Sequence, residues 1–253
     1  MDNMFNFSGK TVVITGASSG LGIQHAKLFA SQGADIAIVA RRYDRLVSLS
    51  EEIEKMGVQC MPIKCDVTNE EDIQAALKQI NEKYGKIDIL INNAGLAKAN
   101  RAEETSKADW NSVLDVNLTG VFLFAKNAAI YMKQQNYGRI INISSVYGKS
   151  VDQCNPVASY YSSKAAVIHL TKSLATEWAK YGITVNAIGP GLFESEMTTR
   201  LLQNKSFETS FKVRCPMARP GKEGELDTTL LFLCSDYSGY VTGQTIYVDG
   251  GLC

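Results

Sequence analysis

Short apolar runs alternate with longer amphipathic segments along most of this sequence. The apolar runs are rich in β-branched residues, which favours strands, and each amphipathic segment is long enough to be a helix that connects two parallel strands. This alternation predicts an α/β fold with a Rossmann-type, doubly wound parallel sheet of about seven strands and helices on both faces. The expected strands are residues 11–15, 35–40, 59–64, 87–91, 139–144, 184–188 and 244–248, and the expected helices are residues 20–32, 43–56, 69–84, 102–134 and 158–180.

The length and composition favour one ordinary globular unit. The chain has 253 residues, and no proline-rich or serine-rich linker divides it. We therefore expect a single domain over residues 1–253, in which residues 192–218 cover a substrate site. The 26 basic and 26 acidic side chains leave no net charge, so nothing indicates a nucleic acid or an anionic membrane as a partner.

Targeting and metal signals are not evident in the sequence. The N-terminal residues lack a basic stretch followed by an apolar run, and no later apolar run is long enough to predict a membrane span. We expect a cytoplasmic protein. The six cysteines are scattered without a C-x-x-C pair, which predicts reduced thiols and neither a disulfide framework nor a metal site.

A glycine-rich turn joins the first predicted strand to the first predicted helix. Residues 15–22 have the sequence TGASSGLG. Glycines at this place let the backbone approach a pyrophosphate, which unpaired amides and the helix dipole stabilise. A plain flexible turn is the alternative, but the strand before it and the helix after it favour a dinucleotide site. The residues expected to contact the coenzyme here are Gly16, Ser18, Ser19, Gly20, Leu21 and Gly22.

The end of the second predicted strand indicates which coenzyme binds. An acidic residue at this place would hydrogen-bond the adenosine ribose and repel a 2′-phosphate, but the sequence has Arg41 and Arg42 instead. Cationic side chains with several donors suit a phosphate monoester, so we expect NADP(H) to be preferred, with NAD(H) still possible. The alternative interpretation is that both arginines only solvate the start of a helix.

Tyr160 and Lys164 form the second chemical signal, because a spacing of four residues places both on one face of a predicted helix. An ammonium group beside a phenol stabilises the phenolate, which favours proton transfer near neutral pH. Ser144 and Ser145 end the preceding strand, where a hydroxyl can hold a substrate oxygen beside the phenol. Such a serine can equally be buried or cap a helix.

These residues together resemble the short-chain dehydrogenase/reductase family over essentially the whole chain. Further motifs match in order: NNAG at residues 92–95 after the fourth strand, Asn117 within VNL, and Pro190-Gly191 after the sixth strand. The resemblance implies that Tyr160 is the acid/base and that Lys164 binds the nicotinamide ribose and lowers the phenol pKa. It also implies that Ser145 orients the substrate oxygen and that Asn117 supports a water-mediated proton relay. The resemblance further implies coenzyme contacts from Asp66, Val67, Asn93, Ala94, Gly95, Tyr160, Lys164, Pro190, Gly191 and Ser195.

The substrate is less constrained. The resemblance favours Ser145 over Ser144, because the family's serine usually stands immediately before a turn like Val146-Tyr147-Gly148. From Ser145 to Tyr160 the chain is about two residues longer than in many members of the family, which draws attention to the loop of residues 149–159. This loop, with Tyr147, Cys154 and Asn155, is expected to shape the substrate pocket.

A finer resemblance, at residues 186–197 and 243–251, is to the gluconate 5-dehydrogenase and sugar reductase branch. It implies a sugar keto-acid or ketose, with Lys98 or Arg101 pairing with a carboxylate.

Other interpretations stay open. The apolar side chains within residues 192–211 also suit a steroid or another apolar ketone, although such a stripe is more often a packed lid helix. A catalytically silent dinucleotide sensor is a third possibility, which the intact serine, tyrosine and lysine argue against. The resemblance implies a homotetramer or a homodimer, which the sequence alone does not establish.

Overall fold

The computed structural model describes residues 4–152, 156–196 and 198–253. Its strands form one seven-stranded parallel sheet in the order β3-β2-β1-β4-β5-β6-β7, which confirms the expected fold class. The strands are β1 (Thr11–Thr15), β2 (Asp35–Ala40), β3 (Cys60–Lys64), β4 (Ile89–Asn92), β5 (Gly138–Ile143), β6 (Ile183–Pro190) and β7 (Thr245–Val248). Each begins and ends within two residues of its predicted bounds.

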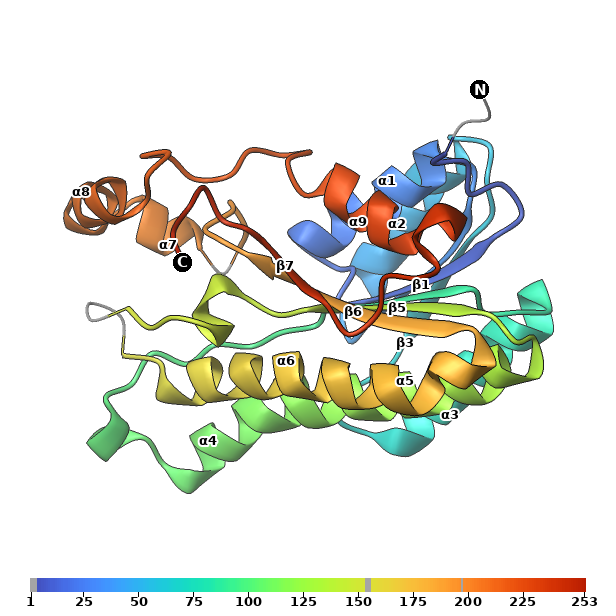
Figure 1. The fold of residues 1–253 in the computed structure, drawn as a ribbon, viewed down its shortest axis with the longest axis horizontal. Helices are drawn as coiled ribbons and strands as arrows, with labels where there is room; N and C mark the ends of the chain where they lie inside the picture. The colour runs from blue at the N-terminus through green and yellow to red at the C-terminus, as the bar shows by residue number, and fades with distance from the viewer. Residues whose placement is uncertain (1–3, 153–155, 197) are drawn as a thin grey trace.

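The helices cover both faces of this sheet (Figure 1). They are α1 (Leu21–Ser31), α2 (Tyr43–Glu54), α3 (Glu70–Tyr84), α4 (Lys107–Leu114), α5 (Gly120–Gln134), α6 (Ala158–Trp178), α7 (Thr199–Leu202), α8 (Lys205–Arg214) and α9 (Asp227–Cys234). Short turns are η1 (Ala102–Glu104), η2 (Asp115–Thr119), η3 (Val146–Gly148), η4 (Ala179–Tyr181) and η5 (Asp236–Ser238). Figure 1 shows α1, α2 and α9 on one face and α3, α5 and α6 on the other, with α7 and α8 at one end.

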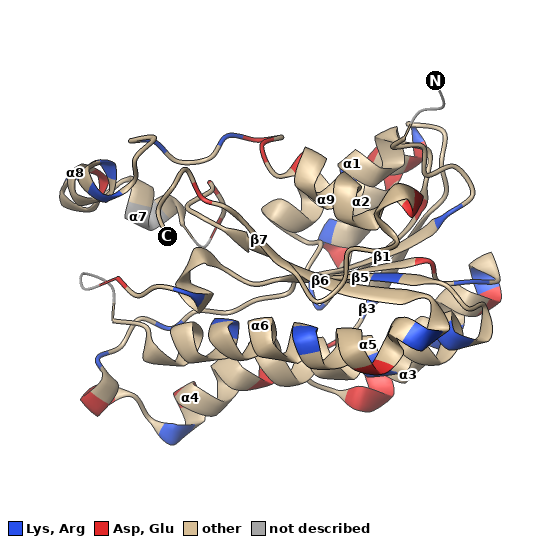
Figure 2. Cartoon of the chain, viewed as in Figure 1, with Lys and Arg blue, Asp and Glu red and all other residues tan. Residues whose placement is uncertain are grey.

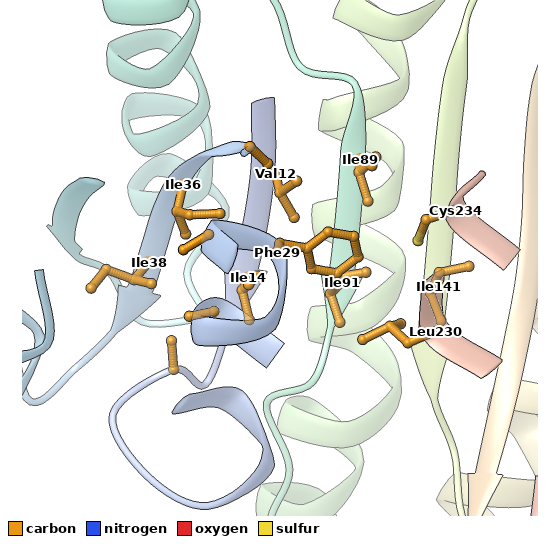
Figure 3. Packing of buried hydrophobic residues seen from close by; sticks show 14 of the residues in the cluster. Val12, Ile14, Phe29, Ile36, Ile38, Ile89, Ile91, Ile141, Leu230 and Cys234 are labelled. Carbon is orange, nitrogen blue, oxygen red and sulfur yellow. The ribbon is translucent and has the colours of Figure 1, made fainter. Parts of the chain in front are cut away.

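Alternate strand residues fill two separate cores, because successive side chains of a strand point to opposite faces. In β1, Val12 and Ile14 pack on the face of α1 and α9, whereas Val13 packs on the face of α3 and α5. Figure 3 shows the first of these cores, where Phe29 of α1 lies beside Ile14 and Ile91. Burial on both faces explains why the inner strands are mostly apolar and do not alternate regularly with polar residues.

The direction in which the chain winds reverses at β1, which pairs with β2 on one side and with β4 on the other. Loops that leave the carboxyl ends of these two strands diverge toward opposite sheet edges. In open α/β sheets the resulting crevice is where ligands bind. The fold therefore places the glycine turn after β1 and the residues after β4 beside each other.

Three local predictions were wrong. The segment 102–134, expected as one helix, is divided into η1, α4, the π-helical turn η2 and α5. By sequence, Thr68 is a plausible N-cap of the third helix, with Glu71 three residues later, but the helix is capped by Asn69, whose side chain accepts a hydrogen bond from the Asp72 amide. Helix α9 was not foreseen, because its run of leucines lacks a polar face that would have indicated a helical period.

One helical run has the length and hydropathy of a membrane span. It comprises Lys107–Gln134, with a mean hydropathy of 1.3, and half of its most apolar part is buried within the protein. This run forms part of the second core, where Phe124 and Met132 are fully buried. It is therefore a core helix of the fold. Figure 2 shows that charged residues of both signs are scattered over the helices in this view.

Candidate active site

A cavity of about 410 Å³ lies at the carboxyl ends of the central strands. It contains nearly all of the residues that the sequence assigned to the coenzyme and the reaction. Those lining it are Gly16, Ser18, Ser19, Gly20, Leu21, Arg41, Arg42, Asp66, Val67, Asn93, Ala94, Gly95, Ser145, Tyr160, Lys164, Pro190, Gly191 and Ser195. Gly22 and Asn117 do not line it, and both have a different place in the site.

The glycine turn is held in shape by close backbone packing. Gly20 has a φ of 55° and a ψ of −134°, which residues with a Cβ rarely adopt. A Cβ on Gly22 would lie 2.5 Å from the Gly16 carbonyl oxygen and 2.8 Å from the Asn93 Nδ2. Gly22 does not line the cavity, and its lack of a Cβ lets α1 pack against the turn, so the coenzyme contact expected from it stays a prediction. Asn93 donates to the carbonyl oxygens of Thr15 (3.0 Å) and Gly16 (3.3 Å), so it also anchors the turn.

Arg42 spans the cleft entrance. Its Nε donates to the Ser18 hydroxyl (3.1 Å) and its Nη2 to the Ser19 hydroxyl (2.8 Å), which holds the guanidinium over the glycine turn. Arg41 is largely exposed and lies 3.9 Å from an Asp66 carboxylate oxygen. A second cavity of about 370 Å³ adjoins these arginines and is also lined by Arg45 and Lys64. The entrance therefore carries several cations that suit a phosphate.

Tyr160 and Ser145 meet at the inner end of the cavity. Burial raises the pKa of the Tyr160 phenol, and a hydrogen bond with the Ser145 side chain opposes that rise. The Ser145 hydroxyl also accepts from the Tyr147 amide at 3.1 Å. Ser144 instead donates to the Lys164 carbonyl oxygen of α6 at 2.9 Å. The two serines therefore have separate roles, and the geometry favours Ser145 as the one that faces a substrate oxygen.

Lys164 lies one helical turn after Tyr160, as the spacing predicted. Only 3% of the residue is exposed, and burial lowers the pKa of its ammonium to about 8. Its Nζ donates to the Ile143 carbonyl oxygen at 2.7 Å and lies 5.6 Å from the centre of the Tyr160 ring. The ammonium can offer further hydrogen bonds to the cavity it lines. A lowering of the phenol pKa by Lys164 stays a prediction, because in this structure the opposing effect comes from Ser145.

Asn117 is fully buried in the π-helical turn η2. Its side chain accepts from the Leu96 amide (2.7 Å) and donates to the Leu96 carbonyl oxygen (2.8 Å) and the Ser163 hydroxyl (3.0 Å). Interruptions of this kind in a helix frequently occur at functional sites. Asn117 thus ties the helix to the strand-four loop beside Gly95, and the expected proton relay stays a prediction.

The start of the covering segment, residues 192–218, forms one wall of the cavity. Phe193, Glu196 and Thr198 line it together with Ser195. Of these four residues, the sequence predicted only Ser195 as a coenzyme contact, because no local motif indicates which residues of this segment turn toward the cavity. Phe193 is buried and packs so closely on Gly221 that a Cβ there would meet its ring. The aromatic ring therefore anchors the base of the segment. Other lining residues that the sequence did not indicate are Ala40, Cys65, Val116, Ile143 and Ser144.

The expected carboxylate partners do not reach the cavity. Lys98 pairs with Asp109 at 2.6 Å, Arg101 lies 4.0 Å from Glu103, and neither Lys98 nor Arg101 lines the cavity. Among the expected pocket residues of the loop 149–159, Cys154 and Asn155 lie outside the described residues.

A buried polar cluster joins this loop to α8. Asp152 accepts from the Tyr147 hydroxyl (3.1 Å) and pairs with Arg214 (2.8 Å). The Tyr147 and Tyr161 rings pack against each other with their centres 5.2 Å apart. The loop after Ser145 is therefore fixed to the covering segment.

The cleft fits a dinucleotide. Its glycine turn leaves room for backbone contact with a pyrophosphate at the start of α1, its entrance carries arginines, and its inner end holds a phenol, a hydroxyl and an ammonium. Within the described residues, no group of three or more metal-ligating side chains is arranged to hold an ion. The arrangement suits proton transfer to or from a substrate oxygen beside a nicotinamide.

Comparison with known proteins identifies the family. A family described as enoyl-(acyl carrier protein) reductase matches residues 16–253. The 3-oxoacyl-(acyl-carrier-protein) reductase of Staphylococcus aureus is 38% identical over 245 residues, which cover 96% of this chain and 98% of the relative. The chain belongs to the short-chain dehydrogenase/reductase family. It is an oxidoreductase of the short-chain type.

Further short-chain dehydrogenases/reductases are similar over their whole length. The gluconate 5-dehydrogenase of Gluconobacter oxydans is 36% identical over 251 residues, which cover 99% of this chain and 97% of the relative. The structure of a gluconate 5-dehydrogenase from Burkholderia cenocepacia, in complex with NADP and tartrate, superimposes with a TM-score of 0.94 at 35% identity. That comparison covers 98% of this chain and 97% of the other. Relatives with different substrates are thus about equally similar.

Proposed function

We propose that this protein is an NADP(H)-dependent ketoreductase that interconverts an alcohol and a ketone on a small polar substrate, a sugar keto-acid or ketose. The observation that carries the proposal is the convergence of Ser145, Tyr160 and Lys164 at the inner end of a cleft whose entrance holds Arg41 and Arg42. The first group suits carbonyl reduction, and the second suits a phosphorylated coenzyme.

The coenzyme preference is supported by charge at the entrance. Arg41 and Arg42 line both the main cavity and the adjoining basic cavity. A 2′-phosphate at this place would meet guanidinium groups and the Ser18 hydroxyl, whereas NAD(H) would leave these donors to water. The relative crystallised in complex with NADP is consistent with this preference.

The reaction follows from the positions of the side chains. A bound nicotinamide supplies the hydride for reduction, or accepts it for oxidation. Ser145 donates a hydrogen bond to the substrate oxygen and holds it beside the Tyr160 phenol, which gives up its proton as that oxygen becomes an alcohol. The buried Lys164 ammonium stabilises the resulting phenolate and would hydrogen-bond the ribose of a bound coenzyme. Asn117, bound to both backbone groups of Leu96, keeps the neighbouring loop in place.

The substrate class is supported by the relatives. The gluconate 5-dehydrogenases act on a polar sugar acid by name. Tyr147, expected to shape the pocket, is bound to Asp152 and does not line the cavity. A second candidate is a 3-oxoacyl thioester, which the similarity to the Staphylococcus aureus reductase favours. We also propose that the protein is cytoplasmic and that it forms a homotetramer or a homodimer.

A substrate panel tests this function. Purified protein is assayed with NADPH and with NADH against 5-ketogluconate, fructose, sorbose, an acetoacetyl thioester and a ketosteroid, with the absorbance of the reduced coenzyme as the readout. NADPH-selective turnover of the keto-acid or ketoses is expected. Arg41→Ala should weaken NADPH binding by roughly tenfold or more and leave NADH binding little changed. If the enzyme turns over the thioester or the steroid faster than the keto-acid and the ketoses, the proposed substrate class is wrong. If Arg41→Ala weakens the binding of NADPH and NADH equally, the proposed site for the 2′-phosphate is wrong.

A further inference from the structure

Glu196, in the turn that follows Phe193, binds Arg42, the arginine at the entrance of the proposed coenzyme cleft. Its Oε2 accepts from the Arg42 Nη1 at 3.0 Å, and its Oε1 accepts from the Arg45 Nη1 at 2.5 Å. The two guanidinium groups lower the pKa of the Glu196 carboxyl to about 2, so this group is ionised at neutral pH. A carboxylate from the covering segment thus bridges two cations at the cleft entrance.

The Arg42 guanidinium has five N–H donors, three of which are used by contacts with side chains, and the one on Nη1 is given to Glu196. Its Nε and Nη2 already bind Ser18 and Ser19, and its Nη1 binds Glu196. A phosphate that bound beside this fork would compete for donors that the carboxylate now occupies. It would also lie close to a like charge, and repulsion between the two anions would weaken one of the contacts.

The turn that carries Glu196 is fixed internally. The Thr198 hydroxyl donates to the Phe193 carbonyl oxygen at 2.6 Å, and the Thr199 hydroxyl donates to the Ser195 carbonyl oxygen at 2.6 Å. The Ser195 and Thr198 hydroxyls also lie 3.0 Å apart. These bonds fix the backbone of the turn, and the Glu196 carboxylate links this turn to Arg42. Ser195 and Thr198 of the same turn line the cavity.

We propose that Glu196 is a residue that determines coenzyme specificity: its carboxylate competes with the 2′-phosphate for Arg42 and Arg45 and ties the covering segment to the glycine turn. Binding of NADP(H) displaces this carboxylate from the arginines and thereby frees the start of the covering segment. Binding of NAD(H) leaves the contact between Glu196 and the arginines intact. The inference rests on the proposed preference for NADP(H). It predicts that Glu196 lowers the affinity for NADP(H) and does not change the affinity for NAD(H).

Two nucleotide fragments test the inference without any turnover. The affinities of 2′,5′-ADP and 5′-AMP are measured by calorimetry for the wild-type protein, Glu196→Gln, the control Glu194→Gln, and Arg42→Ala. Glu194 is exposed on the same segment and, among the described residues, has no ion pair. Glu196→Gln should bind 2′,5′-ADP roughly three- to fivefold tighter and 5′-AMP within about twofold of the wild type. Glu194→Gln should change neither affinity.

An unchanged affinity of Glu196→Gln for 2′,5′-ADP, or a parallel loss for both fragments, would overturn the inference, because the carboxylate would then not compete with a phosphate. If the wild-type protein binds 2′,5′-ADP no tighter than 5′-AMP and Arg42→Ala alters neither, the proposed coenzyme preference fails as well. Hydrogen exchange gives a second readout. The Thr198 amide, which donates to the Ser195 carbonyl oxygen, should exchange faster with 2′,5′-ADP bound than with 5′-AMP bound. Equal exchange would reject the coupling to the segment.

Discussion

His25 gives the protein a dependence of stability on pH that can be calculated. It lies in α1, is 1% exposed, and neither ring nitrogen has a hydrogen-bond partner among the described residues. Burial therefore lowers the pKa of its imidazole from 6.5 to about 4. Between these values the unfolded chain binds a proton that the folded chain does not. The free energy of unfolding should fall by roughly 1.4 kcal/mol for each pH unit, about 3 kcal/mol in all, as the pH decreases through this window.

Replacement of the imidazole isolates this effect. His25→Leu should lose the part of the pH dependence between pH 6.5 and pH 4 that comes from the buried imidazole, whatever its overall stability, because only the slope is compared. His169, the other histidine, is exposed, so His169→Leu should keep the wild-type slope. The assay is urea unfolding at a series of pH values, followed by tryptophan fluorescence. Equal slopes for the wild-type protein and His25→Leu would refute the argument that burial excludes the proton.

Two further substitutions test packing around the site. Gly22→Ala should weaken coenzyme binding and lower the free energy of unfolding by about 1–3 kcal/mol, because the added Cβ meets the Gly16 carbonyl oxygen. Calorimetry measures the binding, and urea unfolding measures the stability. The matched control is Gly239→Ala, because the nearest atoms to a Cβ there are 3.6 Å away. Identical behaviour of the two variants would contradict this. Asp152→Asn should lower the free energy of unfolding by about 1–2 kcal/mol, because it weakens the ion pair with the partly exposed Arg214. It should also raise KM, because this pair fixes the loop after Ser145 to the covering segment. An unchanged KM would show that the pair does not position the substrate site.

The sheet could be predicted because its determinants are local and repeated. The inner strands β1, β2, β4, β5 and β6 are rich in β-branched residues and almost wholly buried, which distinguishes them from the amphipathic helices around them. The edge strands β3 and β7 are only partly buried. The same logic did not extend to α9, whose leucines show no polar face. Nor did it locate the interruption at Asn117, which depends on the contact with Leu96, distant in sequence.

The site could be predicted to the extent that its residues belong to motifs. Tyr160, Lys164 and Ser145 lie on elements whose spacing fixes their relation, and the structure places them in one cavity. Glu196 and Arg214 could not be found in this way. Their partners, Arg42 and Asp152, lie on different elements, and only the folded path of the covering segment brings these charges together.

The most direct test of the central claim, that Tyr160 donates the proton during carbonyl reduction, is a comparison of Tyr160→Phe with the wild-type protein. The substitution keeps the aromatic ring in place and removes the only proton that the side chain can transfer. Turnover with the best substrate of the panel should fall by roughly a hundredfold to ten-thousandfold, while the dissociation constant for NADPH stays within about twofold. Turnover equal to that of the wild type would contradict the assignment of Tyr160 as the acid/base.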